Sequence, residues 1–219
     1  MDEPAKSLPQ LSQQKDGRTG IVIGTGPSLR DVADLVRAQK GKCLLFGINN
    51  TYRDFPLDVW IACDPAWHAH YGKVEGDFDK WHWDKGICER HGYRYIEGRW
   101  ADGLSTDPSW ISYGHSSGWQ ALNLAVHYGC DRILLVGYDM NYPKGQPRHY
   151  FDGLSDVPGE YPAPLRKFSE MSKAGNTGLL WDYRHIAEQS RRGEIPPIIN
   201  CTPKTAMAWF PVKHLSECV

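Results

Sequence analysis

The sequence predicts an α/β fold of the Rossmann-like type, with a mostly parallel sheet flanked by helices. Short, nearly continuous apolar runs alternate along the chain with segments whose apolar residues recur at helical spacing. A glycine-rich turn joins the first apolar run to the first helical segment. The strand-like runs contain few polar residues, as expected where helices cover both faces of a parallel sheet.

The first elements follow from this pattern. Residues 21–23 are a β-branched strand, and the apolar residues of 28–39 then recur at helical spacing. Two further apolar runs, 43–48 and 58–63, predict buried strands. Together they give the strand–helix–strand alternation that produces right-handed crossovers.

The later elements are less uniform. Residues 65–115 are rich in histidine, tryptophan, glycine and charge, and give one clear strand, at 93–96. The segment 117–128 has helical spacing and ends at Gly129, and 133–137 is the most strand-like run of the chain. The remaining expected elements are a long lid-like loop rich in proline and glycine at 141–164, a helix at 177–189, a central strand at 197–200 and a short edge piece at 206–211.

Length and composition limit the classes of protein. The 219 residues suffice for one large domain, so we expect a flexible N-terminal segment over 1–19 and a single nucleotide-binding domain over 20–219. The formal net charge of -1 argues against a strongly basic nucleic-acid binder. The polar N-terminus and the lack of a long apolar run predict a cytoplasmic protein without a membrane partner. Six scattered cysteines predict buried free thiols.

The turn after the first strand has the composition of an anion-binding site. Its residues are Gly24, Thr25, Gly26, Pro27 and Ser28. Glycines let the backbone approach a phosphate closely, and the free N–H groups and the helix dipole then hold it. An ordinary strand-to-helix turn is the alternative. NAD is disfavoured, because Leu29 replaces the third glycine of the dinucleotide fingerprint and no acid follows the second strand. Gly26→Val is expected to block the site with little change in fold.

Polar residues also follow the other predicted strands. The carboxyl ends of parallel strands lie at one edge of a sheet, so we expect these residues to line one crevice. Asn49 and Asn50 suit a ribose or a base edge, or a simple turn. Asp64 suits a hydroxyl, a metal ion or a helix cap, and Asp139 ends the strand at 133–137.

The helix at 117–128 opens on a second small polar motif. A serine hydroxyl and free amides at this point can hold a phosphate or a carboxylate, or can simply cap the helix. The motif consists of Ser116, Ser117 and Gly118.

Histidine and tyrosine residues provide the candidates for proton transfer. His149 is a candidate general base within the long loop, and His185 in the following helix is the other candidate. The hydroxyl of Tyr150 can stabilise a leaving phosphate. No metal site is predicted, because His68 and His70 have no third ligand nearby. Seven tryptophans between residues 60 and 119 fit core packing, or stacking against an acceptor ring.

Four stretches taken together resemble the core of a transferase superfamily. They are IVIGTGPSL, GINNTYRDFPLDVWIACDP, SSGWQALNLAVHYGCDRILLVGYDM and HYFDG. This superfamily includes the bacterial sialyltransferases of the Campylobacter lipooligosaccharide type and the MptE-like (6-hydroxymethylpterin pyrophosphokinase-like) proteins. The resemblance covers about residues 20 to 155.

The resemblance implies a donor site. The 24–28 turn is similar to the G-N-GPS motif that holds the nucleotide of a CMP-sugar, with Thr25 in place of the asparagine. Asn49 or Asn50 matches the asparagine that follows the second strand. Residues 116–118 match the T-S-G of the donor site, and residues 137–139 match a G-x-D strand end.

The resemblance also implies catalytic roles. Tyr150 is similar to a tyrosine that steadies the leaving phosphate, and Tyr142 falls close to a second one. The family base is a histidine, for which His149 and His185 are both candidates. Such transferases need no metal cofactor, because tyrosines replace the cation. The MptE-like kinases use ATP and Mg²⁺ instead, which Asp64 and Asp139 would hold here.

These features predict a glycosyltransferase that binds a nucleotide-activated sugar donor. The acceptor hydroxyl belongs to a small molecule, a glycan or a modified DNA base, as would suit a phage or a bacterium that decorates its own polymer. A homo-oligomer is expected. The alternatives are an MptE-like diphosphotransferase dependent on ATP and Mg²⁺, and a nucleotide-binding module without catalysis.

Overall fold

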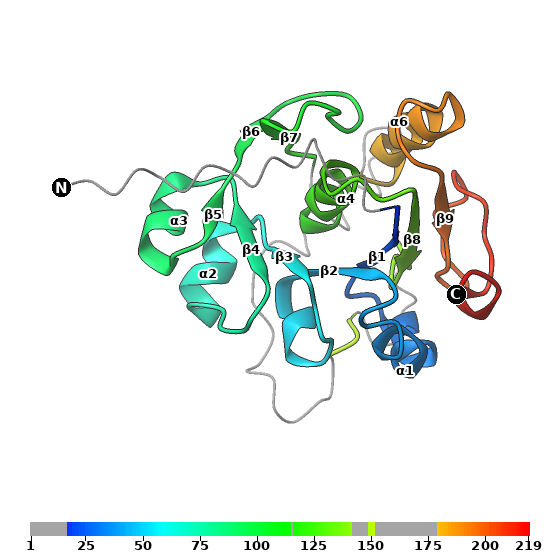
Figure 1. The fold of residues 1–219 in the computed structure, drawn as a ribbon, viewed down its shortest axis with the longest axis horizontal. Coiled ribbons are helices and arrows are strands. Elements are labelled where there is room, and N and C mark those ends of the chain that lie inside the picture. The colour runs from blue at the N-terminus through cyan, green and yellow to red at the C-terminus, as the bar shows by residue number, and fades with distance from the viewer. Residues whose placement is uncertain (1–16, 115, 142–148, 152–178) are drawn as a thin grey trace.

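The computed structural model describes residues 17–114, 116–141, 149–151 and 179–219 (Figure 1). A seven-stranded sheet has the order β5-β4-β3-β2-β1-β8-β9, and all its strand pairs are parallel. Its strands are β1 (Thr19–Ile23), β2 (Leu44–Ile48), β3 (Val59–Ile61), β4 (Asp79–His82), β5 (Arg94–Tyr95), β8 (Arg132–Val136) and β9 (Ile198–Asn200). A separate parallel pair joins β6 (Glu97–Arg99) to β7 (Trp110–Ser112).

Helices cover both faces of the main sheet (Figure 1). One face packs against α4 (Ser117–His127) and α6 (Leu179–Arg191). The other packs against α1 (Ala33–Arg37), α2 (Pro65–Tyr71), α3 (Lys85–His91) and the short 3₁₀ segments η1 (Pro27–Asp31) and η3 (Leu215–Glu217). Alternate residues of each strand serve the two cores: Val22 faces α4, whereas Ile21 and Ile23 face α1.

The predicted fold class is therefore confirmed. The strands expected at 21–23, 43–48, 58–63 and 133–137 and the helix at 117–128 are all present, with ends shifted by one or two residues. Most of the loop expected at 141–164 lies outside the described residues. The domain limits stay a prediction, with β1 beginning at Thr19. Among the described helices, none combines the length and apolar character needed to cross a lipid bilayer.

Four local expectations need correction. The helix at 28–39 is divided into η1 and α1, because Val32 leaves the helical conformation with φ -125° and ψ 4°. Residues 65–115 contain α2, β4, α3, β6 and β7 besides β5. Strand β9 lies at the edge of the sheet and not in its centre. Residues 206–211 form no strand, and the neighbouring Val212 makes a single bridge to Asn200.

The turn after β1 packs directly on the turn after β8. The amide of Gly26 donates to the Gly137 carbonyl at 2.8 Å. The carboxylate of Asp139 accepts from the Ser28 amide at 3.1 Å and from its hydroxyl at 2.8 Å. A Cβ added at Gly26 would lie 1.9 Å from the Asp139 Oδ2, and one at Gly24 would lie 2.5 Å from the Gly137 carbonyl oxygen. Both glycines are needed because these two turns touch. The expectation that Gly26→Val would leave the fold little changed is therefore wrong, because any side chain at this position meets the turn after β8.

Two buried histidines lie side by side between α2 and β4. His68 and His82 are 3% and 0% exposed, and their ring centroids are 4.9 Å apart. The Nδ1 of His68 and the Nε2 of His82 meet no hydrogen-bond partner in the described structure. Burial, together with the neighbouring imidazoles, lowers the pKa of each to about 4. Both rings are therefore held neutral in the folded protein.

We expect Gly26→Ala to destabilise the fold by about 3 kcal/mol, because the new methyl group overlaps the Asp139 carboxylate. Gly26 has φ -67°, so the effect is steric and not conformational. Gly86→Ala in the exposed part of α3 is the control: its Cβ would lie 3.3 Å from the Asp84 Oδ1, so its effect should stay within about 1 kcal/mol, well below that of Gly26→Ala. Urea unfolding measures both. Equal stability of Gly26→Ala and the wild type would contradict the packing described here.

Stability should fall as the pH drops from about 6.5 toward 4. In that window the unfolded chain binds protons at His68 and His82, whereas the folded protein does not. Each histidine therefore lowers the free energy of unfolding by on the order of 1–2 kcal/mol at pH 5. His82→Asn keeps an acceptor for the Asp84 amide, which the His82 Nδ1 now provides, and removes one titrating group. It should flatten the dependence of Tm on pH. Equal pH slopes for His82→Asn and the wild type would refute this assignment.

Candidate functional site

The carboxyl edge of the sheet brings three of the predicted segments together. Asn49 follows β2, Cys63 follows β3, and Ser117 begins α4. The Ser117 hydroxyl donates to the Asn49 Oδ1 at 3.0 Å and accepts from the Cys63 amide at 2.9 Å. One buried hydroxyl therefore joins two strand ends to a helix N-terminus, as the expected shared edge requires.

Asn49 serves both as a turn residue and as a polar group at this edge. Its φ of 47° is a left-handed conformation that asparagine tolerates better than most residues. Its carbonyl accepts from the Trp60 indole at 2.8 Å. Its side-chain NH₂ makes no bond within the described residues, so it is available to a ligand. The neighbouring Asn50 is buried, and its Oδ1 has no partner in the described structure.

Residues 116–118 cap α4 and link it to α6. The Ser116 hydroxyl accepts from the Trp119 amide at 3.2 Å and lies 3.5 Å from the Tyr183 hydroxyl. The Gly118 carbonyl accepts from the Tyr138 hydroxyl at 3.0 Å, and a Cβ at Gly118 would lie 2.9 Å from that oxygen. The first two amides of the helix, those of Ser117 and Gly118, form no hydrogen bond in the part of the chain that is described. These are the N-terminal donors of α4, and both residues are buried.

The 24–28 turn is arranged differently from the phosphate loop expected there. Its Gly26 and Ser28 amides bind Gly137 and Asp139, so the Asp139 carboxylate occupies the position given to an external anion. Burial raises the pKa of Asp139, and the two bonds from Ser28 oppose that shift. A phosphate at this turn would have to displace a carboxylate or lie against it. The alternative named above, an ordinary strand-to-helix turn, describes these contacts better.

The two acidic residues considered for Mg²⁺ each have a structural contact. Asp64 caps α2 by accepting from the Ala66 amide at 2.9 Å, as the capping alternative predicted. Asp139 binds Ser28. No contact between the two carboxylates is seen in the described structure.

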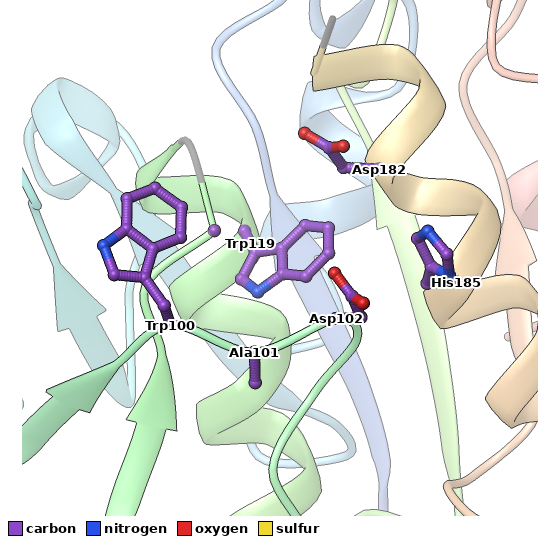
Figure 2. A pocket seen from close by; sticks show the side chains of 7 residues that line it. Trp100, Ala101, Asp102, Trp119, Asp182 and His185 are labelled. Carbon is purple, nitrogen blue, oxygen red and sulfur yellow. The ribbon is translucent and has the colours of Figure 1, made fainter. Parts of the chain in front are cut away.

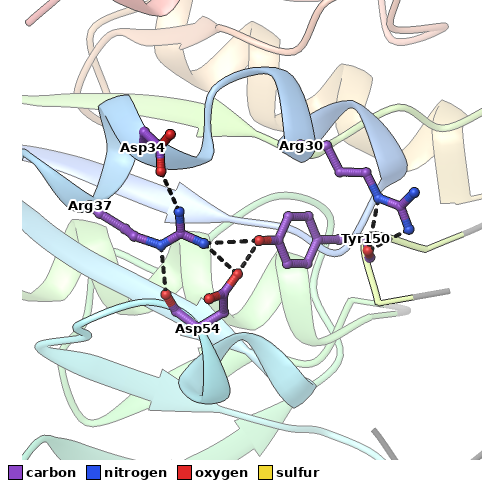
Figure 3. Close-up of polar contacts among 5 residues, drawn as sticks. All are labelled: Arg30, Asp34, Arg37, Asp54 and Tyr150. Atoms are coloured by element: carbon purple, nitrogen blue, oxygen red, sulfur yellow. Dashed lines mark hydrogen bonds and ion pairs between the residues drawn. The ribbon is translucent and has the colours of Figure 1, made fainter. Parts of the chain in front are cut away.

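Tyr150 is fastened to the α1 side of the sheet (Figure 3). Its hydroxyl donates to the Asp54 carboxylate, and the Arg37 Nη2 donates to that hydroxyl at 3.1 Å. Arg30 donates twice to the Tyr150 carbonyl, at 3.0 and 2.8 Å. The side chain is 6% exposed, and burial raises its pKa, with a further rise from Asp54. The expected contact with a leaving phosphate is not the one made here, because the hydroxyl is bound within the protein.

The two candidate bases lie in different places. The Nδ1 of His149 is 3.3 Å from the Thr25 hydroxyl, beside the turn after β1, where the Tyr150 amide also donates to the Thr25 carbonyl at 2.7 Å. His185 lies on α6 and lines a pocket. Tyr142, the second tyrosine considered for catalysis, lies outside the described residues.

The pocket that contains His185 is formed by three segments distant in sequence (Figure 2). Its volume is about 300 Å³, and its lining residues are Trp100, Ala101, Asp102, Gly114, Trp119, Asp182 and His185. It lies on the α4 and α6 face of the sheet, next to the Ser116–Tyr183 contact.

Side-chain amides hold the walls of this pocket in place. The Oε1 of Gln189 accepts from the Leu104 amide at 2.7 Å, and its Nε2 donates to the Leu104 carbonyl at 3.0 Å. This pair fixes the segment after β6 against α6. Gly114, with φ 49°, allows the Trp119 ring to lie on the backbone, because a Cβ there would be 2.0 Å from the ring. Sequence reasoning missed Asp102 and Asp182, which no local motif connects.

Comparison with known proteins supports the fold. No family model matches the sequence, and no curated protein matches it. Among solved structures, the MAf glycosyltransferase from Magnetospirillum magneticum AMB-1 is similar, with a TM-score of 0.58 and 16% sequence identity. The likeness covers 90% of this chain and 33% of that protein, so this chain spans about a third of its length. The chain shares its Rossmann-like α/β fold with part of a glycosyltransferase.

Proposed function

We propose that this protein transfers a sugar from a nucleotide donor to a hydroxyl acceptor. The observation that carries the proposal is the fold likeness to a glycosyltransferase over 90% of the chain. Polar groups stand at the carboxyl edge of the sheet, where α/β folds bind their ligands. A pocket with a histidine and two carboxylates adjoins them.

The donor binds between β2 and the N-terminus of α4. The Asn49 NH₂ faces the ribose or the base. The Ser117 hydroxyl fixes the orientation of this side-chain amide by donating to its Oδ1. The donor phosphates lie at the N-terminus of α4, toward the buried amides of Ser117 and Gly118, where the dipole of an eleven-residue helix favours negative charge. This position replaces the 24–28 turn, because Asp139 repels an anion there. No metal cofactor is assigned to the site.

The transfer is a substitution at the anomeric carbon. The acceptor oxygen forms a bond to the anomeric carbon. At the same time the bond between that carbon and the donor phosphate oxygen breaks, and its electron pair leaves with the nucleotide. The acceptor proton passes to a base, a transfer typically worth about 10²–10⁴-fold in rate. We assign this role to His185, because it lines a pocket that can hold an acceptor, whereas the described contacts of His149 are with the 24–28 turn.

Nucleotides should raise the Tm of the protein. We expect one of CMP, UMP, UDP or GDP to do so without magnesium, by about 2.7 kcal/mol of stability at a hundredfold excess over Kd. Ser117→Ala should reduce the shift, because it frees Asn49 to turn away, and Asn49→Asp should abolish it. Ser109→Ala, an exposed serine, is the matched control. No shift with any nucleotide would end the donor proposal, and a shift with ATP and magnesium alone would favour diphosphotransfer.

Replacing the two histidines separates the candidate bases. With the stabilising nucleotide sugar and a panel of methyl glycosides as acceptors, His185→Gln should slow nucleotide release by about 10²–10⁴-fold. His149→Gln should change it only a few-fold. If His149→Gln slowed nucleotide release more than His185→Gln, the base would be His149, beside the Thr25 hydroxyl.

A further inference from the structure

We infer that the pocket between β6, α4 and α6 is the acceptor subsite, and that it takes an uncharged, hydroxyl-rich ring of about the size of one pyranose. This inference rests on the proposed function and specifies its acceptor. The pocket volume of about 300 Å³ is at the lower end for small-molecule sites, which fits one ring and not an extended chain.

The exposure of Trp100 points to a ligand that stacks. Its side chain is 71% exposed, the highest value among the exposed large hydrophobic residues of the described structure. It stands at the pocket beside Ala101 and makes an edge contact with Tyr113, with ring centroids 5.9 Å apart. A large aromatic face open to water at the mouth of a pocket is suited to the apolar C–H face of a sugar ring.

The indole of Trp119 provides an independent observation. Trp119 is 2% exposed, and its Nε1 meets no hydrogen-bond partner in the described structure. In Figure 2 the nitrogen edge of the ring faces the segment that carries Ala101 and Asp102. A buried N–H without an acceptor is costly, so an oxygen atom within the pocket satisfies it. A sugar hydroxyl provides that oxygen.

The charges of the pocket select the class of acceptor. Asp102 and Asp182 are both carboxylates, which accept hydrogen bonds from hydroxyl groups. The same charges repel a phosphate or a carboxylate. The pocket is therefore unsuited to the donor phosphates and to acidic sugars. Figure 2 shows the Asp102 carboxylate between the Trp119 ring and the His185 imidazole.

The position of the pocket suits transfer from the proposed donor site. Ser116 and Trp119 belong to the same first turn of α4, and the Ser116 hydroxyl lies 3.5 Å from the Tyr183 hydroxyl of α6. Asp182, the neighbour of Tyr183, lines the pocket. The N-terminus of α4 and the acceptor pocket are therefore neighbouring parts of the protein.

The test is ligand-observed NMR by saturation transfer on the full chain. The probes are methyl glucoside, galactoside, mannoside and N-acetylglucosaminide, with methyl glucuronide as an acidic sugar of matched size and methyl glucosaminide as a cationic one. At least one neutral glycoside should bind at millimolar concentration. The glucuronide should bind at least about tenfold more weakly, and the difference should narrow in the double variant Asp102→Asn, Asp182→Asn.

Aromatic variants localise the binding. Trp100→Ala should weaken binding about tenfold, while Tyr95→Ala, another exposed aromatic residue outside the pocket, should have no effect. Trp119→Phe removes the indole N–H and keeps a ring, so binding should weaken several-fold. Absence of neutral-sugar binding, binding insensitive to Trp100→Ala, or binding of the glucosaminide alone would each overturn the inference.

The two proposals fail separately. Nucleotide binding without sugar binding overturns the acceptor subsite and leaves the donor site standing. Sugar binding without nucleotide binding does the reverse, because the glycosides are tested without any donor.

Discussion

The contact between the turns after β1 and β8 is the constraint on which the arrangement of this edge depends. Gly26 binds Gly137, and Ser28 binds Asp139, so no space remains for a side chain at Gly26. The contact joins the neighbouring strands β1 and β8 at their carboxyl ends. It also occupies the amides that a strand–glycine–helix motif commonly offers to phosphate. The proposed donor site therefore uses the N-terminus of α4 instead.

The two faces of the sheet differ in structure. On the α1 face, Tyr150 is bonded to Asp54 and Arg37 and closes a packed core. On the α4 face, Trp119 and His185 border a pocket. The donor and acceptor positions proposed above both involve the start of α4, which belongs to the second face.

Periodicity was sufficient for the main architecture. The buried strands and α4 have regular apolar patterns in the sequence. Such patterns predict the folded elements well, because burial of apolar residues determines both the pattern and the fold. Periodicity failed for β4, which begins with the half-buried charged residues Asp79 and Lys80, and for two seven-residue helices too short to show a period. Those helices had another signal, since Asp64 and Asp84 cap them.

The candidate site was only partly predictable. The rule that parallel strands end at one edge predicted a crevice that includes Asn49, but not that Ser117 would bind Asn49 there. The rule does not say which way a side chain turns, so the Tyr150 hydroxyl could not be placed beneath Arg37 in advance. The pocket was not predictable, because Asp102 and Asp182 meet only through tertiary packing.

The fit of Gly114 beneath Trp119 has an evolutionary consequence. Because any Cβ at 114 would lie 2.0 Å from the indole, neither position can change alone without emptying or crowding the same space. Descendants of this chain that keep the tryptophan must keep the glycine, and a lineage that acquires a larger residue at 114 must first lose the ring. The two sites are thus expected to covary.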